Sequence, residues 1–175
     1  MKLCSCRIIL CTLTGISSKL NAEQFFRAAI NRRLGEKDIS LSTDGTSDLK
    51  LDILPKLMNI HISARMVGDY DNSKPLLITD KFAGTTTMAM GFVQINGIYI
   101  PNTALKKDVR EITSKATRRK VAAVLIKARS DVLYKRLTYL AKGLTIDDAL
   151  FKPVIREKVD TQKLTAAFPI PKNTE

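Results

Sequence analysis

The sequence has no tryptophan, a single histidine and only three cysteines. The shortage of cysteine argues against a disulfide-stabilised protein. The cysteines, Cys4, Cys6 and Cys11, lie in one short segment, and an odd, clustered set does not describe a disulfide framework. We expect reduced, buried thiols, as in a cytosolic protein. The spacing of Cys4 and Cys6 is wrong for a zinc knuckle and no second cysteine pair follows, so no metal site is expected there.

Long hydrophobic runs are also lacking, since none approaches the roughly 18–20 residues that a membrane span needs. The first residues are apolar after Lys2, but Arg7 interrupts them and no clean cleavage site follows. We therefore predict a β-strand over 3–14 rather than a secretory signal.

The familiar catalytic motifs are missing too: there is no P-loop, no GxGxxG and no HExxH. The one histidine, His61, lies between apolar residues in LMNIHISAR. Two interpretations stay open for it, a partly buried structural histidine and a catalytic base.

Positive charge is abundant, with 29 Lys and Arg against 17 Asp and Glu, a net charge of +12. The segment 106–142 holds twelve Lys/Arg and three acids, so 12 − 3 = +9 of that excess lies there. A concentrated cationic surface is typical of proteins that bind nucleic acid. Aromatic residues make up only 6% of the chain, which favours contacts to phosphate or to protein over base stacking.

The pattern of elements predicts an α+β fold, with an N-terminal strand and helices packed on an antiparallel β meander. A helix is expected over 22–34, with Asn21 as N-cap and Gly35 at its C-terminal end, then a polar turn over 40–47. A second helical region should cover 48–64, broken or restarted at Pro55. Short strands are predicted at 65–70, 76–79, 87–95, 97–100, 120–129 and 137–141, with a hairpin turn at Asn96-Gly97. We expect a domain over 1–146 and a tail over 147–175, with a short helix near 147–151 and extended chain after it.

Three lysines follow apolar runs that read as strands, namely Lys81, Lys127 and Lys142. RNA can be cleaved without metal when a base takes the 2′-OH proton and cations stabilise the phosphorane. A lysine that is desolvated or crowded by other cations has a lowered pKa and can act as that base. We assign Lys127 to phosphate stabilisation and Lys81 to anchoring or base catalysis, with Lys142 as a third site residue. Tyr134 or Thr138 would supply a supporting hydroxyl.

Other polar residues nearby are candidates for holding substrate. Asn102 and Thr103 follow Pro101, where they could bind a phosphate or cap a turn, whereas Asp108 and Arg110 are expected to form a surface pair. The complete set of predicted substrate-binding residues is Asn102, Thr103, Lys106, Arg110 and Arg129.

The order of several short motifs over about residues 12–143 resembles a phage-type nuclease domain of the barnase–EndoU–colicin–RelE superfamily, the fourth such phage subfamily. Each motif is weak alone, and the order and spacing make the likeness moderately specific. The matching residues are Leu13-Thr14-Gly15, Thr79-Asp80-Lys81, Gly84, Met90-Gly91-Phe92, Tyr99, Pro101-Asn102-Thr103, Lys106, Asp108, Arg110, Lys127, Tyr134, Leu137-Thr138-Tyr139 and Ala141-Lys142.

This resemblance implies a small barnase/RelE-like fold, with N-terminal helices against a four- or five-stranded antiparallel sheet, and metal-independent RNA cleavage without a cofactor. It implies a phage or mobile-element protein that acts on RNA in the cytoplasm of a bacterial host. A host protein and a cognate inhibitor stay open as further partners. One departure is Thr12, which stands where the family pattern has histidine before Leu-Thr-Gly. The alternatives are therefore a catalytically degenerate nucleic-acid binder and a module that interacts with a host protein.

Overall fold

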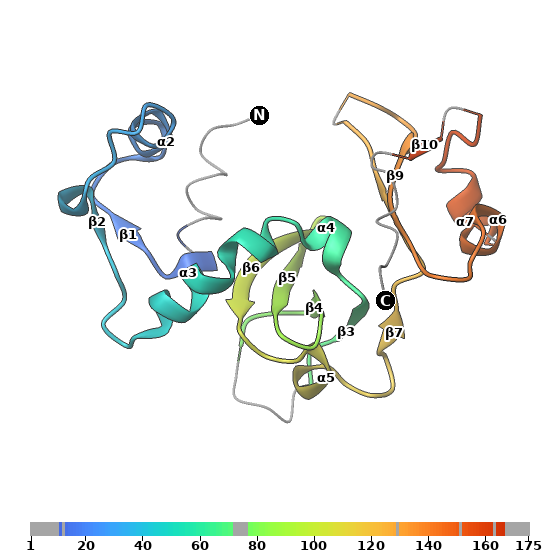
Figure 1. Cartoon of the computed structure of the whole chain (residues 1–175), viewed down its shortest axis with the longest axis horizontal. Coiled ribbons are helices and arrows are strands. Elements are labelled where there is room, and N and C mark those ends of the chain that lie inside the picture. Colours follow the sequence, from blue (N-terminus) through green and yellow to red (C-terminus); the bar gives the residue numbers. More distant parts are fainter. Residues whose placement is uncertain are drawn as a thin grey trace.

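The computed structural model describes residues 11, 13–71, 77–128, 130–150, 152–162 and 164–166. A five-stranded antiparallel sheet lies at the centre of the molecule, with strand order β6-β5-β4-β3-β7. A small two-stranded sheet lies on one side of it in Figure 1 and a three-stranded sheet on the other. This confirms the predicted α+β class. No helix in the described ranges has the length and apolar character needed to cross a membrane.

The predicted strand over 3–14 is wrong where it can be checked. Cys11, Leu13 and Thr14 are helical, and the Gly15 N–H donates to the Cys11 carbonyl at 2.8 Å. Residues 1–10 and 12 lie outside the described ranges. The β preference of such residues is weak, and here the packing of Leu13 into the core formed with Ile53 and Leu57 outweighs it.

The helix predicted over 22–34 is present but shorter, as α2 (Ala22–Ile30). Asn21 is its N-cap, with Oδ1 accepting from Glu23 N and Gln24 N at 3.1 and 2.9 Å. The helix ends early because Arg32 takes a left-handed φ of 54°, and Gly35 instead precedes the short 3-10 helix η1 (Glu36–Asp38). Strands β1 (Ser17–Ser18) and β2 (Ile39–Ser40) pair antiparallel around this unit.

The second helical region is confirmed as two helices, α3 (Thr46–Leu57) and α4 (Ile60–Ser63). Pro55 lies inside α3, which continues through it to Leu57. The break predicted at Pro55 is therefore wrong, because the two helices are separated at Met58 and Asn59 instead.

The central sheet contains β3 (Met66–Asp69), β4 (Lys81–Gly84), β5 (Ala89–Ile95), β6 (Ile98–Leu105) and β7 (Arg119–Lys120). The hairpin between β5 and β6 turns at Asn96 and Gly97, whose φ angles of 52° and 77° match a type I′ turn. The strand predicted at 76–79 is wrong for 77–79, where the chain bends and a strand begins only at Lys81.

Side chains of the central strands alternate between two cores, as period-2 geometry requires. Met88, Met90 and Ala104 pack with Leu57 of α3 on one face. Phe82 and Ala89 pack on the other face, with Val109 of the short helix α5 (Val109–Ile112). The sheet is thus covered on both faces at its centre, and the polar positions lie toward its ends.

The predicted single meander is wrong in one respect, because its last strands leave the central sheet. β8 (Ala123–Ile126) and β9 (Arg136–Leu140) pair antiparallel in a separate sheet, and β10 (Thr165–Ala166) adds to β9 in parallel.

The short helix predicted in the tail is present as α6 (Ile146–Ala149). A second helix, α7 (Pro153–Arg156), was not predicted, although Pro153 fits a first helical position. Thr138 Oγ1 ties the separate sheet to α4 by donating to the His61 carbonyl at 3.0 Å.

Candidate functional site

Lys81 lies at the start of β4, directly opposite Asp69 at the end of β3, and the two side chains form an ion pair. The Lys81 ammonium also lies 5.7 Å from the centroid of the Tyr99 ring on β6. The three side chains are only half-buried, with Lys81 35% exposed and Asp69 42% exposed. The result is an accessible cluster of an ammonium, a carboxylate and a phenol ring.

The strand register explains why this cluster forms. Lys81 pairs with Phe92 of β5, which packs on the α3 side of the sheet, and Phe82 next along the chain points to the α5 side. Because side chains alternate, Lys81 belongs to the α3 side. Asp69 shares that side, since directly opposed residues of antiparallel strands face the same way.

The ion pair favours the charged form of both groups. The hydrogen bond to Asp69 raises the pKa of Lys81 against the opposing effect of its partial burial, and the same bond lowers the pKa of Asp69. A lysine base needs a lowered pKa, so this direction argues against Lys81 as the base. It favours the alternative role, in which a permanently charged ammonium binds phosphate.

The chain leading into Lys81 is held by the predicted substrate residue Asn102. The Thr79 hydroxyl donates to Asn102 Oδ1 at 3.2 Å, and Asn102 Nδ2 donates to the Ile78 carbonyl. A Cβ on Gly91 would meet Thr103 Cγ2 at 2.4 Å and Thr79 Cγ2 at 2.8 Å, so the glycine allows these segments to touch. Asn102 and Thr103 thus buttress the approach to Lys81.

The predicted surface pair of Asp108 and Arg110 is confirmed, with the guanidinium donating to both carboxylate oxygens at 2.6–3.1 Å. Asp108 also caps α5 through the Arg110 N–H at 2.8 Å, and the pKa of Asp108 is lowered chiefly by the Arg110 side chain. Lys106 pairs with Asp52 of α3. Both predicted cations, Lys106 and Arg110, therefore already have carboxylate partners.

The remaining predicted residues lie in or beside the three-stranded sheet. Lys127 directly follows β8, donates to the Val132 carbonyl at 2.9 Å and lies 5.3 Å from the centroid of the Tyr134 ring. Thr138 Oγ1 is engaged with backbone carbonyls, at 3.0 Å to His61 and 3.2 Å to Val124. Arg129 lies outside the described residues.

Lys127 and Lys142 are not brought together by the register of this sheet. Ile126 pairs with Arg136 and Ala123 with Leu140, so Lys127 and Lys142 flank opposite ends of the β8–β9 ladder. Lys127 lies one residue beyond one end of this ladder and Lys142 two residues beyond the other, so at about 3.3 Å per residue their Cα positions are about 20 Å apart. A single phosphate therefore does not contact both lysines.

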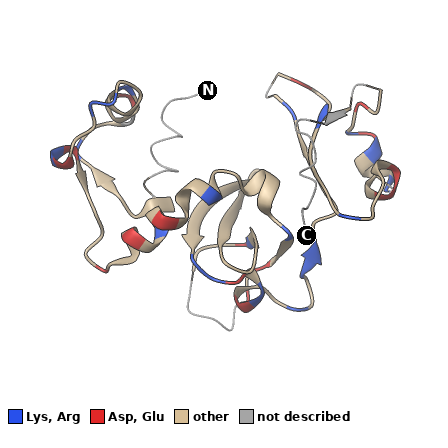
Figure 2. Cartoon of the chain, in the orientation of Figure 1, with Lys and Arg blue, Asp and Glu red and all other residues tan. Residues whose placement is uncertain are grey.

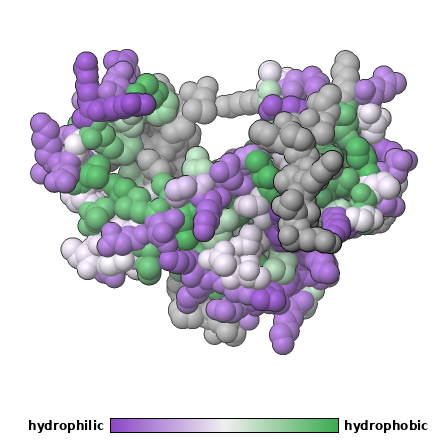
Figure 3. Space-filling view, viewed as in Figure 1, coloured by the Kyte–Doolittle hydropathy of each residue, from purple (hydrophilic) through white to green (hydrophobic). Residues whose placement is uncertain are grey.

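The positive segment is spread over several elements rather than one sheet face. It runs from Lys106 through α5, β7 and β8 to the turn after β9, and Figure 2 shows β7, an edge strand of the central sheet, as wholly cationic. In Figure 3 hydrophilic side chains cover the lower part of the molecule, over the region of α5.

Asp69 was not among the predicted site residues, since only the β3–β4 register reveals its pairing with Lys81. Within the described ranges, no three His, Cys, Asp or Glu side chains gather in a way that could hold a metal ion.

Comparison with known proteins identifies one family. The model of the family described as phage-Barnase-EndoU-ColicinE5/D-RelE like nuclease4 matches residues 13–143. This match spans the chain from the helical turn at Leu13 to the turn after β9, and it includes Asp69, Lys81 and Tyr99. No curated protein and no solved structure matches the chain.

Proposed function

The chain belongs to the phage-Barnase-EndoU-ColicinE5/D-RelE like nuclease4 family, and on that premise we propose that it is a metal-independent endoribonuclease acting in the host cytoplasm. The reaction is transesterification, in which the 2′-OH gives its proton to a base and its oxygen attacks the neighbouring phosphorus. The bond from phosphorus to the 5′-oxygen breaks, and that oxygen takes up a proton from water. The products are a 2′,3′-cyclic phosphate end and a 5′-hydroxyl end.

The observation that carries the proposal is the exposed cluster of Lys81, Asp69 and Tyr99. The scissile phosphate carries one negative charge before attack and two in the phosphorane, so a fixed ammonium beside it binds the transition state more tightly. Asp69 holds the Lys81 ammonium in place and keeps it protonated. The half-exposed Tyr99 ring borders the cluster, where it can contact the sugar or base of the bound nucleotide.

Asp69 is the proposed proton acceptor for the 2′-OH. Its lowered pKa leaves it ionised at neutral pH, and a phosphate that attracts Lys81 frees a carboxylate oxygen. This assignment replaces a lysine base with a carboxylate base.

Lys127 beside Tyr134 is the second place where the scissile phosphate could lie, since its ammonium is exposed and adjoins an aromatic ring. The comparison of the Lys81→Ala and Lys127→Ala variants decides between the two locations. Loss of cleavage only in Lys127→Ala would move the site to the three-stranded sheet.

The test is cleavage of mixed RNA in EDTA, with analysis of the product ends. We expect wild type to leave 2′,3′-cyclic phosphates and Lys81→Ala to form them about a hundredfold more slowly. Lys37→Ala, which removes an exposed lysine from η1, serves as the matched control. RNA binding without cleavage by the wild type would favour the second candidate, a nucleic-acid binder without catalysis, to which Thr12 in place of the family histidine points.

A further inference from the structure

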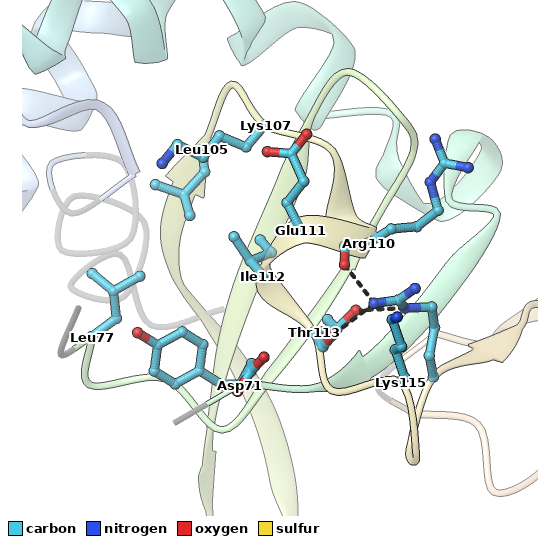
Figure 4. Close-up of a pocket in the computed structure, with 11 residues that line it drawn as sticks. Asp71, Leu77, Leu105, Lys107, Arg110, Glu111, Ile112, Thr113 and Lys115 are labelled. Atoms are coloured by element: carbon cyan, nitrogen blue, oxygen red, sulfur yellow. Dashed lines mark hydrogen bonds between the residues drawn. The ribbon is translucent and has the colours of Figure 1, made fainter. Parts of the chain in front are cut away.

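A pocket of about 580 Å³ opens on the α5 side of the central sheet, the face opposite Lys81 (Figure 4). Its apolar lining comes from the core behind α5, with Tyr70 and Ile112 buried there and Leu77 and Leu105 packed against them. A volume of this size lies within the usual range of about 300–1,000 Å³ for small-molecule sites.

Charged side chains surround this apolar floor. Arg110 is engaged by Asp108, and Arg118 donates to Thr113 Oγ1 at 3.0 Å and to the Thr113 carbonyl at 2.7 Å. The described residues offer no hydrogen bond or ion pair to Lys107 or Lys115. The four cations of the lining are Lys107, Arg110, Lys115 and Arg118, against the carboxylates Asp71 and Glu111.

The two unpaired ammonium groups lie on opposite sides of the pocket. Figure 4 shows Lys107 beside Leu105 and Lys115 at the far side beyond Thr113, with Ile112 between them. An apolar floor between two separate cations matches a single nucleotide, whose flat base lies between the phosphates that precede and follow it. Glu111 on the rim is an acceptor for the amino groups that bases carry.

We propose that this pocket binds one nucleotide of single-stranded RNA, with the base on the apolar floor and the flanking phosphates at Lys107 and Lys115. A base within a duplex is stacked and paired and does not enter such a pocket, so the site selects unpaired RNA. The inference rests on the proposed function, because the RNA held here is the RNA that Lys81 cleaves. The pocket is a binding site separate from the cleavage site.

Binding is measured with a fluorescein-labelled 12-mer RNA carrying 2′-O-methyl groups, which lacks the attacking hydroxyl and therefore stays intact. The test variant is Lys107→Glu with Lys115→Glu. The control is Lys19→Glu with Lys37→Glu, which reverses two exposed lysines near β1 and η1 and brings the net charge to the same +12 − 4 = +8.

We expect the test variant to raise the Kd at least tenfold. Two lost phosphate contacts should also reduce the slope of log K against log salt by about 1.4, at about 0.7 per phosphate in single strands. The control should change the Kd less than threefold, and Lys107→Arg with Lys115→Arg should bind like wild type. Equal weakening in test and control, or no weakening in the test variant, would overturn the pocket as an RNA site.

Cleavage of two substrates separates this inference from the proposed function. With both correct, the test variant raises the KM for an unmodified 12-mer, leaves kcat unchanged and cleaves a dinucleotide as well as wild type does. A wild type that cleaves neither substrate refutes the nuclease proposal while the difference in Kd still stands. Unchanged KM for the 12-mer, with cleavage intact, refutes the pocket alone.

Discussion

Replacing Lys81 with alanine should slow RNA cleavage by about a hundredfold in kcat. At 4 Å and an effective dielectric constant of about 20, an ammonium and one added negative charge attract each other by about 4 kcal/mol. Since the Lys81 side chain is 35% exposed, solvent screens part of this attraction, and about 2–3 kcal/mol remains for the phosphorane. That loss corresponds to about 30–150-fold in rate.

The assay is single-turnover cleavage of a short RNA in EDTA, which reports the chemical step without product release. Lys81→Arg should recover part of the rate because it keeps the charge, and Lys37→Ala should behave as wild type. The exposed pair with Asp69 is worth only about 0–1 kcal/mol, so Lys81→Ala should remain folded by circular dichroism. A loss below threefold in a folded variant would refute the role of Lys81.

Three further predictions concern the same sheet and its surroundings. If Asp69 is the base, kcat/KM should rise with pH only below pH 3.8, because the pKa of Asp69 is lowered. It should then stay level to beyond pH 10, because the pKa of Lys81 is raised. A midpoint near pH 7–8 would instead indicate a lysine base. Gly91→Ala should cost about 1–3 kcal/mol of folding free energy, because its Cβ would overlap Thr103, and a melting temperature equal to wild type would contradict this packing. The pKa of Asp44 is lowered to about 2 by hydrogen bonds, so its contribution is complete above pH 3.8 and lost as pH falls toward 2; the destabilisation by Asp44→Ala in urea should therefore be present at pH 7 and shrink near pH 2.

Local signals were sufficient to predict the elements whose structure depends on nearby residues. Asn21 marks the start of α2, and Asn96-Gly97 marks the β5–β6 turn, because caps and tight turns are built from neighbouring groups. The family motifs could likewise be read in order, since their residues are close along the chain.

Only the tertiary structure decided which distant residues meet. The pairing of Asp69 with Lys81 depends on strand register, and it raises the pKa of Lys81, which favours anchoring over base catalysis among the two roles predicted for this lysine. The helical turn at Leu13 depends on packing against α3, which outweighs a weak β preference.

The sequence by itself determined the α+β class, the Asn21 N-cap, the hairpin and the family, because these depend on local chemistry and motif order. It could not separate β8 and β9 from the central sheet, since strand partners are chosen by long-range burial and register. That choice moved Lys127 and Lys142 onto another sheet and to opposite ends of it. Lys81 and Asp69 stay together on the central sheet. Their contact depends on the β3–β4 register, because a shift of one residue would send one of the two side chains to the other face.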